Sequence, residues 1–203
     1  MSGLEWAFAG ISTTTHSSDP DVPPHTVWAH WIDSKSGTPA VDEGDMYPQP
    51  NGDVLEKGSM VDPATGLVTE YEELWADLEI DTIGAEEKHM CIVLKAEPEN
   101  KLNKGMVVRI GGWCQGILQT GEDITVERWQ WIKKANPPTK SGSAPHQENT
   151  FAKEAEEGNW ERVMRLGSAF LPCGVTFETD LVKDNGKVVF GNLEWKVVEI
   201  YRW

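Results

Sequence analysis

Short apolar runs separated by turn residues constrain the fold of this chain more than any other feature of its sequence. Six runs are rich in β-branched and aromatic residues and are bounded by Gly, Asn, Asp or Pro: residues 25–33, 89–95, 105–110, 113–120, 124–133 and 193–203. Runs of this kind are typical of β-strands, and short turns between them favour antiparallel neighbours. The sequence therefore predicts an all-β, mainly antiparallel fold.

Turn chemistry marks several of the connections. Asn51-Gly52 and Asn185-Gly186 predict hairpin turns, because Asn and Gly tolerate the positive φ angles that such turns require. Gly111-Gly112 joins two apolar runs and predicts either a tight turn or a bulge.

Two short acidic stretches, residues 70–78 and 151–158, are instead predicted to be helical. In the first, Tyr71, Leu74, Trp75 and Leu78 recur at spacings of three and four, which is typical of one helix face. Residues 136–149 read NPPTKSGSAPHQEN and predict a flexible loop, since this polar stretch has no face to bury.

The charge of the chain excludes two classes of partner. Its 18 Lys and Arg residues against 33 Asp and Glu residues give a formal net charge of -15 at pH 7. Such a surface repels phosphate backbones and anionic lipid headgroups, so neither nucleic acid nor a membrane is expected as a partner. Cys91, Cys114 and Cys173 are too few for a disulfide framework, and a reducing cytoplasmic or nuclear location is expected.

Ten tryptophans indicate either densely packed barrel interiors or an aromatic pocket for a flat apolar ligand. The alternation of side chains along a strand places Trp129 with Trp131 on one face and Trp28 with His30 on another. The candidate ligand-binding residues are Trp28, Trp31, Trp113, Trp129, Trp131 and Tyr201.

The sequence contains no motif for a nucleophile, a metal or a cofactor, so no cofactor and no metal are predicted. The acidic residues 42–45 do not have the spacing of a calcium loop and are interpreted as an exposed charged loop. His30 and Gln115 are the candidate catalytic residues, as hydrogen-bond donors. Gln115 shares a strand face with Trp113 and Ile117, so its amide is expected either to pair with buried backbone groups or to face a ligand.

Six segments together carry a family resemblance: EWAFAG (5–10), WAHWIDSKSGTPAVDEGDMYPQPNG (28–52), YEELW (71–75), IVLK (92–95), MVVRIGGWCQGIL (106–118) and LEWKVVE (193–199). With these segments the chain resembles the fungal Hri-type proteins, a family named for an interaction with a casein-kinase-I-type kinase. The resemblance implies two consecutive lipocalin-like β-barrel units. A composition shift near residues 97–104 assigns them to residues 1–98 and 99–203.

The resemblance also implies opening strands before EWAFAG, whereas here this motif begins at Glu5. We therefore expect the first barrel to be incomplete. Such a barrel exposes its interior or offers an edge to a second copy in a homodimer.

Two functional hypotheses stay open. In the first, the protein binds an apolar small molecule and acts as a cofactor-free cyclase or isomerase of fungal secondary metabolism. In the second, it is a non-catalytic interaction module for a casein-kinase-I-type kinase. The contact face would then be Glu70, Glu72 and Glu73, or residues 42–45.

Overall fold

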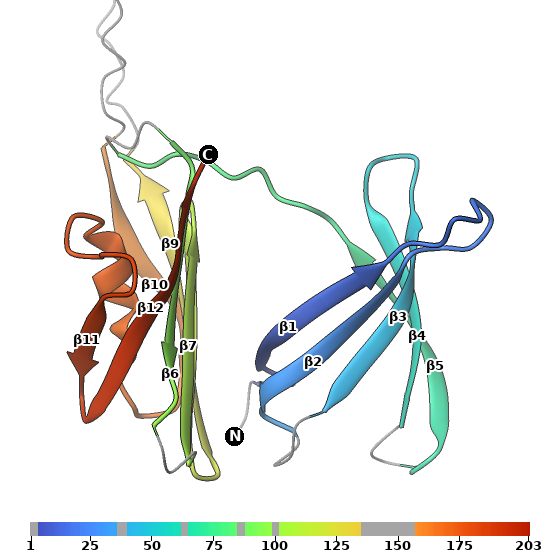
Figure 1. The fold of residues 1–203 in the computed structure, drawn as a ribbon, viewed down its shortest axis with the longest axis horizontal. Helices are drawn as coiled ribbons and strands as arrows, with labels where there is room; N and C mark the ends of the chain where they lie inside the picture. The colour runs from blue at the N-terminus through green and yellow to red at the C-terminus, as the bar shows by residue number, and fades with distance from the viewer. Residues whose placement is uncertain (1–3, 36–39, 62–64, 85–87, 99–101, 135–156) are drawn as a thin grey trace, which may run out of the picture. The chain divides into compact units, whose positions relative to one another are not determined.

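The computed structural model describes residues 4–35, 40–61, 65–84, 88–98, 102–134 and 157–203. In these ranges the chain forms mostly antiparallel β-strands, which confirms the predicted fold class. It divides into two compact units, Met1–Glu79 and Ile80–Trp203, and each unit carries one sheet (Figure 1). The predicted loop at residues 136–149 and most of the predicted helix at residues 151–158 lie outside the described residues.

The first unit is a five-stranded antiparallel meander. Its strands are β1 Phe8–Thr15, β2 His25–Asp33, β3 Val41–Pro48, β4 Val54–Val61 and β5 Val68–Trp75. Each strand pairs with the next one in the chain, so β1 and β5 are the edges of the sheet as far as the described residues show.

Two expectations for this unit are wrong. Residues 70–78 do not form a helix, because β5 pairs with β4 along its whole length and its backbone hydrogen bonds go to that neighbour. Tyr71 and Trp75 both donate hydrogen bonds to Glu56, as side chains on one face of a strand can do. The acidic residues 42–45 lie in β3 between β2 and β4, and not in a loop.

The second unit is built on a seven-stranded sheet. Its strands are β6 Met90–Ala96, β7 Asn103–Ile110, β8 Trp113–Thr120, β9 Asp123–Lys133, β10 Gly158–Leu166, β11 Lys187–Phe190 and β12 Leu193–Arg202, in the spatial order β10-β9-β8-β7-β6-β12-β11. Strand β6 pairs with β7 and β12. The boundary between the units therefore lies before β6, at residues 79 and 80, and not at the expected residues 98 and 99.

The turns follow the chemistry of their residues. Gly111 has a φ of 50°, and the residues that flank the Gly111-Gly112 pair, Ile110 and Trp113, face each other in the register of β7 and β8. This connection is therefore a tight turn, one of the two predicted alternatives. Asn185 is the described non-glycine residue with a positive φ, 56°, which agrees with the turn predicted there.

The core of the second unit lies on one face of its sheet. Alternate side chains of β6 (Met90, Ile92, Leu94) are buried on this face together with Trp195 of β12. A short 3-10 helix, η1 Pro172–Phe177, and the buried residue Leu171 before it pack over the same core. No helix in the described part of the chain has the length and apolar character that a membrane crossing requires.

Gly105 is a position where this packing tolerates no side chain. A methyl group at Gly105 would overlap the Trp195 ring, which is fully buried, whereas one at Gly174 of η1 meets no atom within 4 Å. We expect Gly105→Ala to lower the free energy of unfolding by about 1–3 kcal/mol, the usual cost of overpacking a core. Gly174→Ala is the matched control and should change it little. Equal urea midpoints for the two variants would contradict this account.

Candidate functional site

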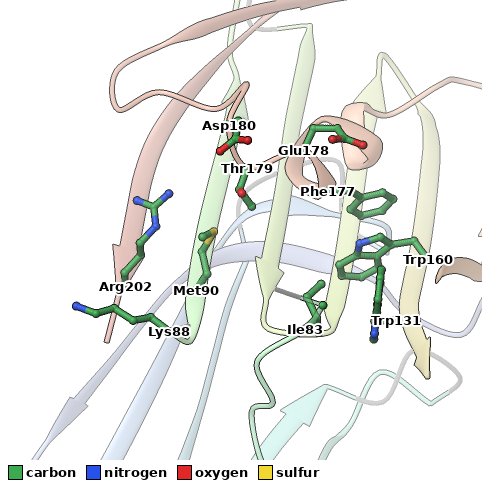
Figure 2. Close-up of a pocket in the computed structure, with 11 residues that line it drawn as sticks. Ile83, Lys88, Met90, Trp131, Trp160, Phe177, Glu178, Thr179, Asp180 and Arg202 are labelled. Atoms are coloured by element: carbon green, nitrogen blue, oxygen red, sulfur yellow. The ribbon is translucent and has the colours of Figure 1, made fainter. Parts of the chain in front are cut away.

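The second unit holds a pocket of about 710 Å³ over one end of its sheet. Side chains from β6, β9, β10, β12 and the segment after η1 line it, together with Ile83 and Gly84 from the start of the unit (Figure 2). The core residue Met90 closes one side. The pocket therefore lies where the packed core of the sheet gives way to solvent.

Three aromatic rings form one wall of the pocket. Trp131 of β9 and Trp160 of β10 face each other in register, and their rings meet edge to face with centroids 6.0 Å apart. Phe177 at the end of η1 stacks on Trp160 at 4.1 Å with an angle of 5° between the planes. Trp129 packs edge to face against Phe177 behind this wall. Such contacts fix the rings relative to one another.

The indole nitrogens of the wall differ in their surroundings. Trp131 Nε1 is buried and has no acceptor among the described residues. Trp160 turns the nitrogen-bearing edge of its ring toward the open centre of the pocket (Figure 2). The wall thus offers the pocket an apolar surface with one hydrogen-bond donor, and indoles are suited to such mixed surfaces.

Arg109 of β7 ties the wall to the sheet. Its side chain is fully buried, and Nη1 donates to the carbonyl oxygen of Thr176 in η1 at 2.7 Å while Nε donates to that of Gly111 at 3.0 Å. The guanidinium also lies over the ring of Trp160, 5.2 Å from its centroid. One buried cation thus fixes η1, the β7–β8 turn and the aromatic wall together.

Glu127 of β9 is the buried anion of the same unit. It accepts hydrogen bonds or ion pairs from three groups: Trp129 Nε1 at 3.0 Å, Arg165 at 2.9 Å and Arg162 at 3.7 Å. These partners satisfy the carboxylate oxygens, which would be costly to bury without hydrogen bonds. It orients Trp129 behind the pocket wall.

Charged side chains of both signs stand around the rest of the pocket. Lys88 and Arg202 lie on the side of β6 and β12, and Glu178 and Asp180 lie on the turn that follows η1 (Figure 2). Within the described residues, none of these four side chains forms an ion pair. The turn itself is closed by a hydrogen bond from Leu181 N to the carbonyl oxygen of Glu178, 2.9 Å long.

His30 sits in the first unit and is almost fully buried. Its Nδ1 donates to Asp33 at 2.7 Å, and its ring stacks on Phe8 at 3.9 Å and meets the edge of Trp6. Asp33 also accepts a hydrogen bond from Trp6 Nε1. The His30 Nε2 atom is buried without a partner among the described residues. Asp33 thereby orients the imidazole as a carboxylate orients a general base. However, His30 lines neither the aromatic-walled pocket of the second unit nor the acidic pocket of the first unit, which is described below.

Carboxylates and aromatic side chains share one face of the first sheet. The Tyr71 hydroxyl lies 2.7 Å from Glu56 and 3.0 Å from Asp42 and shares its one proton between these two acceptors. Trp75 donates to the second oxygen of Glu56 at 2.7 Å. Burial raises the pKa of Tyr71 above its usual range, and the bonds to the two carboxylates add to this. Burial also raises the pKa of Glu73, with further contributions from Glu56 and Asp42.

A second, acidic pocket of about 400 Å³ crosses β2 to β5 of the first unit. Carboxylates of β3 and β5 line it: Glu43, Asp45, Glu70 and Glu72. A hydrogen bond to Asp45 at 2.8 Å raises the pKa of His25, and Lys57 pairs with Glu72 at 2.6 Å. The fold thereby joins the two acidic segments that the sequence offered as alternative contact faces.

The structure separates the predicted site residues. Trp131 lines the larger pocket and Trp129 supports it from behind. Gln115 is exposed and accepts a hydrogen bond from Arg128, so it does not pair with buried backbone groups, the first of its two expected environments, and it does not line the larger pocket. Tyr201 is largely exposed and Trp113 is partly exposed.

The other candidates belong to the first unit. Trp28 stacks on Trp75 with ring centroids 6.1 Å apart, and Trp31 is half-buried. His30 also lies there, whereas Gln115 belongs to the second unit.

Sequence reasoning did not find Trp160, Phe177 or Arg109 as parts of a site. Trp160 lies in β10, where charged residues obscure the alternation of apolar and polar positions that indicates a strand. Phe177 lies at the end of η1 and reaches the sheet through that helix. An available signal was the tryptophan two residues after Gly158, which faces Trp131 once β9 and β10 pair.

Comparisons with known proteins identify a family and a related fold. Residues 1–199 match the protein family described as Protein HRI1. The solved structure of an uncharacterized protein from Saccharomyces cerevisiae, YLR301w, aligns with a TM-score of 0.64 and 19% identity. The alignment covers 98% of this chain and 79% of the yeast chain, so it shows a shared fold. No curated protein matches the sequence.

Replacing Arg109 tests whether it holds η1 and the aromatic wall. In Arg109→Met the carbonyl oxygens of Gly111 and Thr176 lose their donor, at about 1–3 kcal/mol for each buried group left unpaired. We expect a loss of that order in the free energy of unfolding. Arg128→Met removes an exposed arginine from the same sheet and is the control, with a change within about 0.5 kcal/mol. Chemical denaturation that finds the two variants equally stable would contradict the role of Arg109.

Proposed function

This chain belongs to the HRI1 family, and from the pocket of its second unit we propose that it binds a flat small molecule there. The observation that carries the proposal is the aromatic wall of Trp131, Trp160 and Phe177 beside an open volume of about 710 Å³. Pockets for small molecules usually measure about 300–1,000 Å³ and combine aromatic walls with a few polar groups. Both properties are present together at this place.

The rigidity of the wall also supports the proposal. Arg109, Glu127 and the ring contacts fix the aromatic side chains before any ligand arrives. A preorganised wall loses little conformational entropy on binding, so more of the contact energy remains as affinity. The pocket is therefore suited to a ligand with a planar ring system.

A cofactor-free cyclase or isomerase is the catalytic form of this proposal. Such an enzyme holds a reactive conformer and directs a hydrogen-bond donor at developing charge. In the pocket the donor would be Trp160 Nε1, and the Thr179 hydroxyl is another polar group among the lining residues. His30 and Gln115 have no part in this version, because neither of them lines the pocket.

Titration with 2-naphthalenemethanol, a neutral bicyclic probe, tests the pocket by calorimetry. We expect wild type to bind it and Trp160→Ala to bind about tenfold more weakly, since a lost aromatic contact is worth up to about 1.5 kcal/mol. Trp160→Phe keeps a ring in the wall and should retain most of the affinity. Trp113→Ala removes a partly exposed tryptophan of the same sheet and is the control. A wild type that does not bind the probe, or equal losses in Trp160→Ala and Trp113→Ala, would refute the proposal.

The acidic pocket of the first unit supports a second candidate function, docking of a basic protein segment such as one on a casein-kinase-I-type kinase. Glu43, Asp45, Glu70 and Glu72 converge there from two strands, and the hydrogen bond from His25 to Asp45, together with the charges of Asp45 and Glu43, raises the pKa of His25. A groove of one charge attracts partners of the opposite charge and speeds their association.

A lysine-rich peptide labelled with a fluorophore tests this candidate by anisotropy. Glu43→Gln combined with Glu70→Gln should weaken its binding several-fold, and added salt should abolish the difference because exposed charges are screened. Glu122→Gln combined with Glu199→Gln removes the same charge from exposed sites in the second unit and is the control. Equal binding by both double variants would show that only the overall charge of the chain matters.

A further inference from the structure

We propose that the pocket of the second unit selects a zwitterionic aromatic ligand, in which one headgroup next to a planar ring carries both an acidic and a basic group. This inference rests on the proposed function of that pocket and names its ligand class. It comes from the charged side chains that surround the pocket. The aromatic wall alone gives no reason for these charges.

The first observation is that residues of opposite charge line one pocket without pairing. Lys88 and Arg202 stand on one side, and Glu178 and Asp180 stand on the turn after η1 (Figure 2). In the described part of the chain no ion pair within 4 Å involves any of the four, although exposed pairs of this kind form elsewhere in the protein, as between Lys187 and Glu194. Each side therefore keeps its charge available to a group placed between them.

The second observation is the charge balance of the pocket. Two cations and two carboxylates give it no formal net charge, in a chain whose formal net charge is -15. An anionic ligand would meet the negative field of the whole protein and the repulsion of Glu178 and Asp180. A cationic ligand would meet the repulsion of Lys88 and Arg202. A zwitterion satisfies both sides and has no net charge to be repelled.

The third observation is the rigid position of the acidic side. Glu178 and Asp180 follow directly on η1, which Arg109 binds through Thr176, and the hydrogen bond from Leu181 to Glu178 closes their turn. The same helix end carries Phe177 in the aromatic wall. One fixed segment would therefore contact both the ring of a ligand, through Phe177, and the basic group of its headgroup, through Glu178 and Asp180. The acidic group of the headgroup would reach Lys88 and Arg202.

Four probes with one ring system test this inference by calorimetry at low salt. They are 2-naphthalenemethanol (neutral), 2-naphthylacetate (anion), 2-naphthylmethylamine (cation) and 3-(2-naphthyl)alanine (zwitterion). We expect the zwitterion to bind about fivefold or more tightly than each of the others, a ratio that corresponds to about one favourable charge contact. The advantage should shrink as salt is added.

Single-charge variants separate the two sides of the pocket. Arg202→Gln should weaken binding of the anion and the zwitterion but not of the cation, and Asp180→Asn should weaken the cation and the zwitterion but not the anion. Lys196→Gln and Asp184→Asn, which change exposed charges that do not line the pocket, are the matched controls. All variants change exposed residues, so their folding is expected to be unaffected.

The outcomes distinguish this inference from the function on which it rests. Equal binding of all four probes by wild type would refute the zwitterionic ligand class but would still support a binding pocket for aromatic rings. Tightest binding of the anion, unaffected by Asp180→Asn, would overturn it in favour of an anionic ligand. Failure of the neutral probe to bind would refute the pocket itself.

Discussion

The buried guanidinium of Arg109 is the interaction on which the second unit depends. A charge in a protein interior is costly unless its hydrogen bonds are satisfied, and Arg109 donates to Gly111 at the β7–β8 turn and to Thr176 in η1. These two carbonyl oxygens belong to segments that are far apart in the chain. The need to satisfy one cation therefore fixes where η1 lies on the sheet, and with it Phe177 beside Trp160.

Glycine makes this arrangement sterically possible. A side chain at Gly116 would meet Leu171 and Cys173, so its absence lets the segment around η1 approach β8 closely. The sheet face under η1 is consequently closed, whereas the end beyond Phe177 stays open. The pocket is the part of this face that η1 is too short to cover.

The sequence predicted local features well and long-range ones poorly. The bounds of β2 and β8 were found residue for residue, because β-branched and aromatic residues end at clear turn signals there. The alternation in β8 was also right, but the face buried throughout is that of Cys114, Gly116 and Leu118, whereas Gln115 is exposed on the other face. The position of η1 decides which face of β8 is covered. That position is set by contacts between residues far apart in the chain, and no local sequence pattern encodes such contacts.

The two units use the same antiparallel architecture for different interiors. In the first, Glu56 is almost fully buried and bonds to Tyr71 and Trp75, so the aromatic side chains there are committed to carboxylates of the protein. In the second, Glu127 is saturated by its own donors behind the wall, and Trp160 is left to face the open volume. A polar group of a ligand competes poorly with a carboxylate that is already bonded, but readily reaches an unpartnered donor beside an apolar ring. The difference between the units is therefore one of hydrogen-bond satisfaction, and it is the reason for proposing ligand binding in the second.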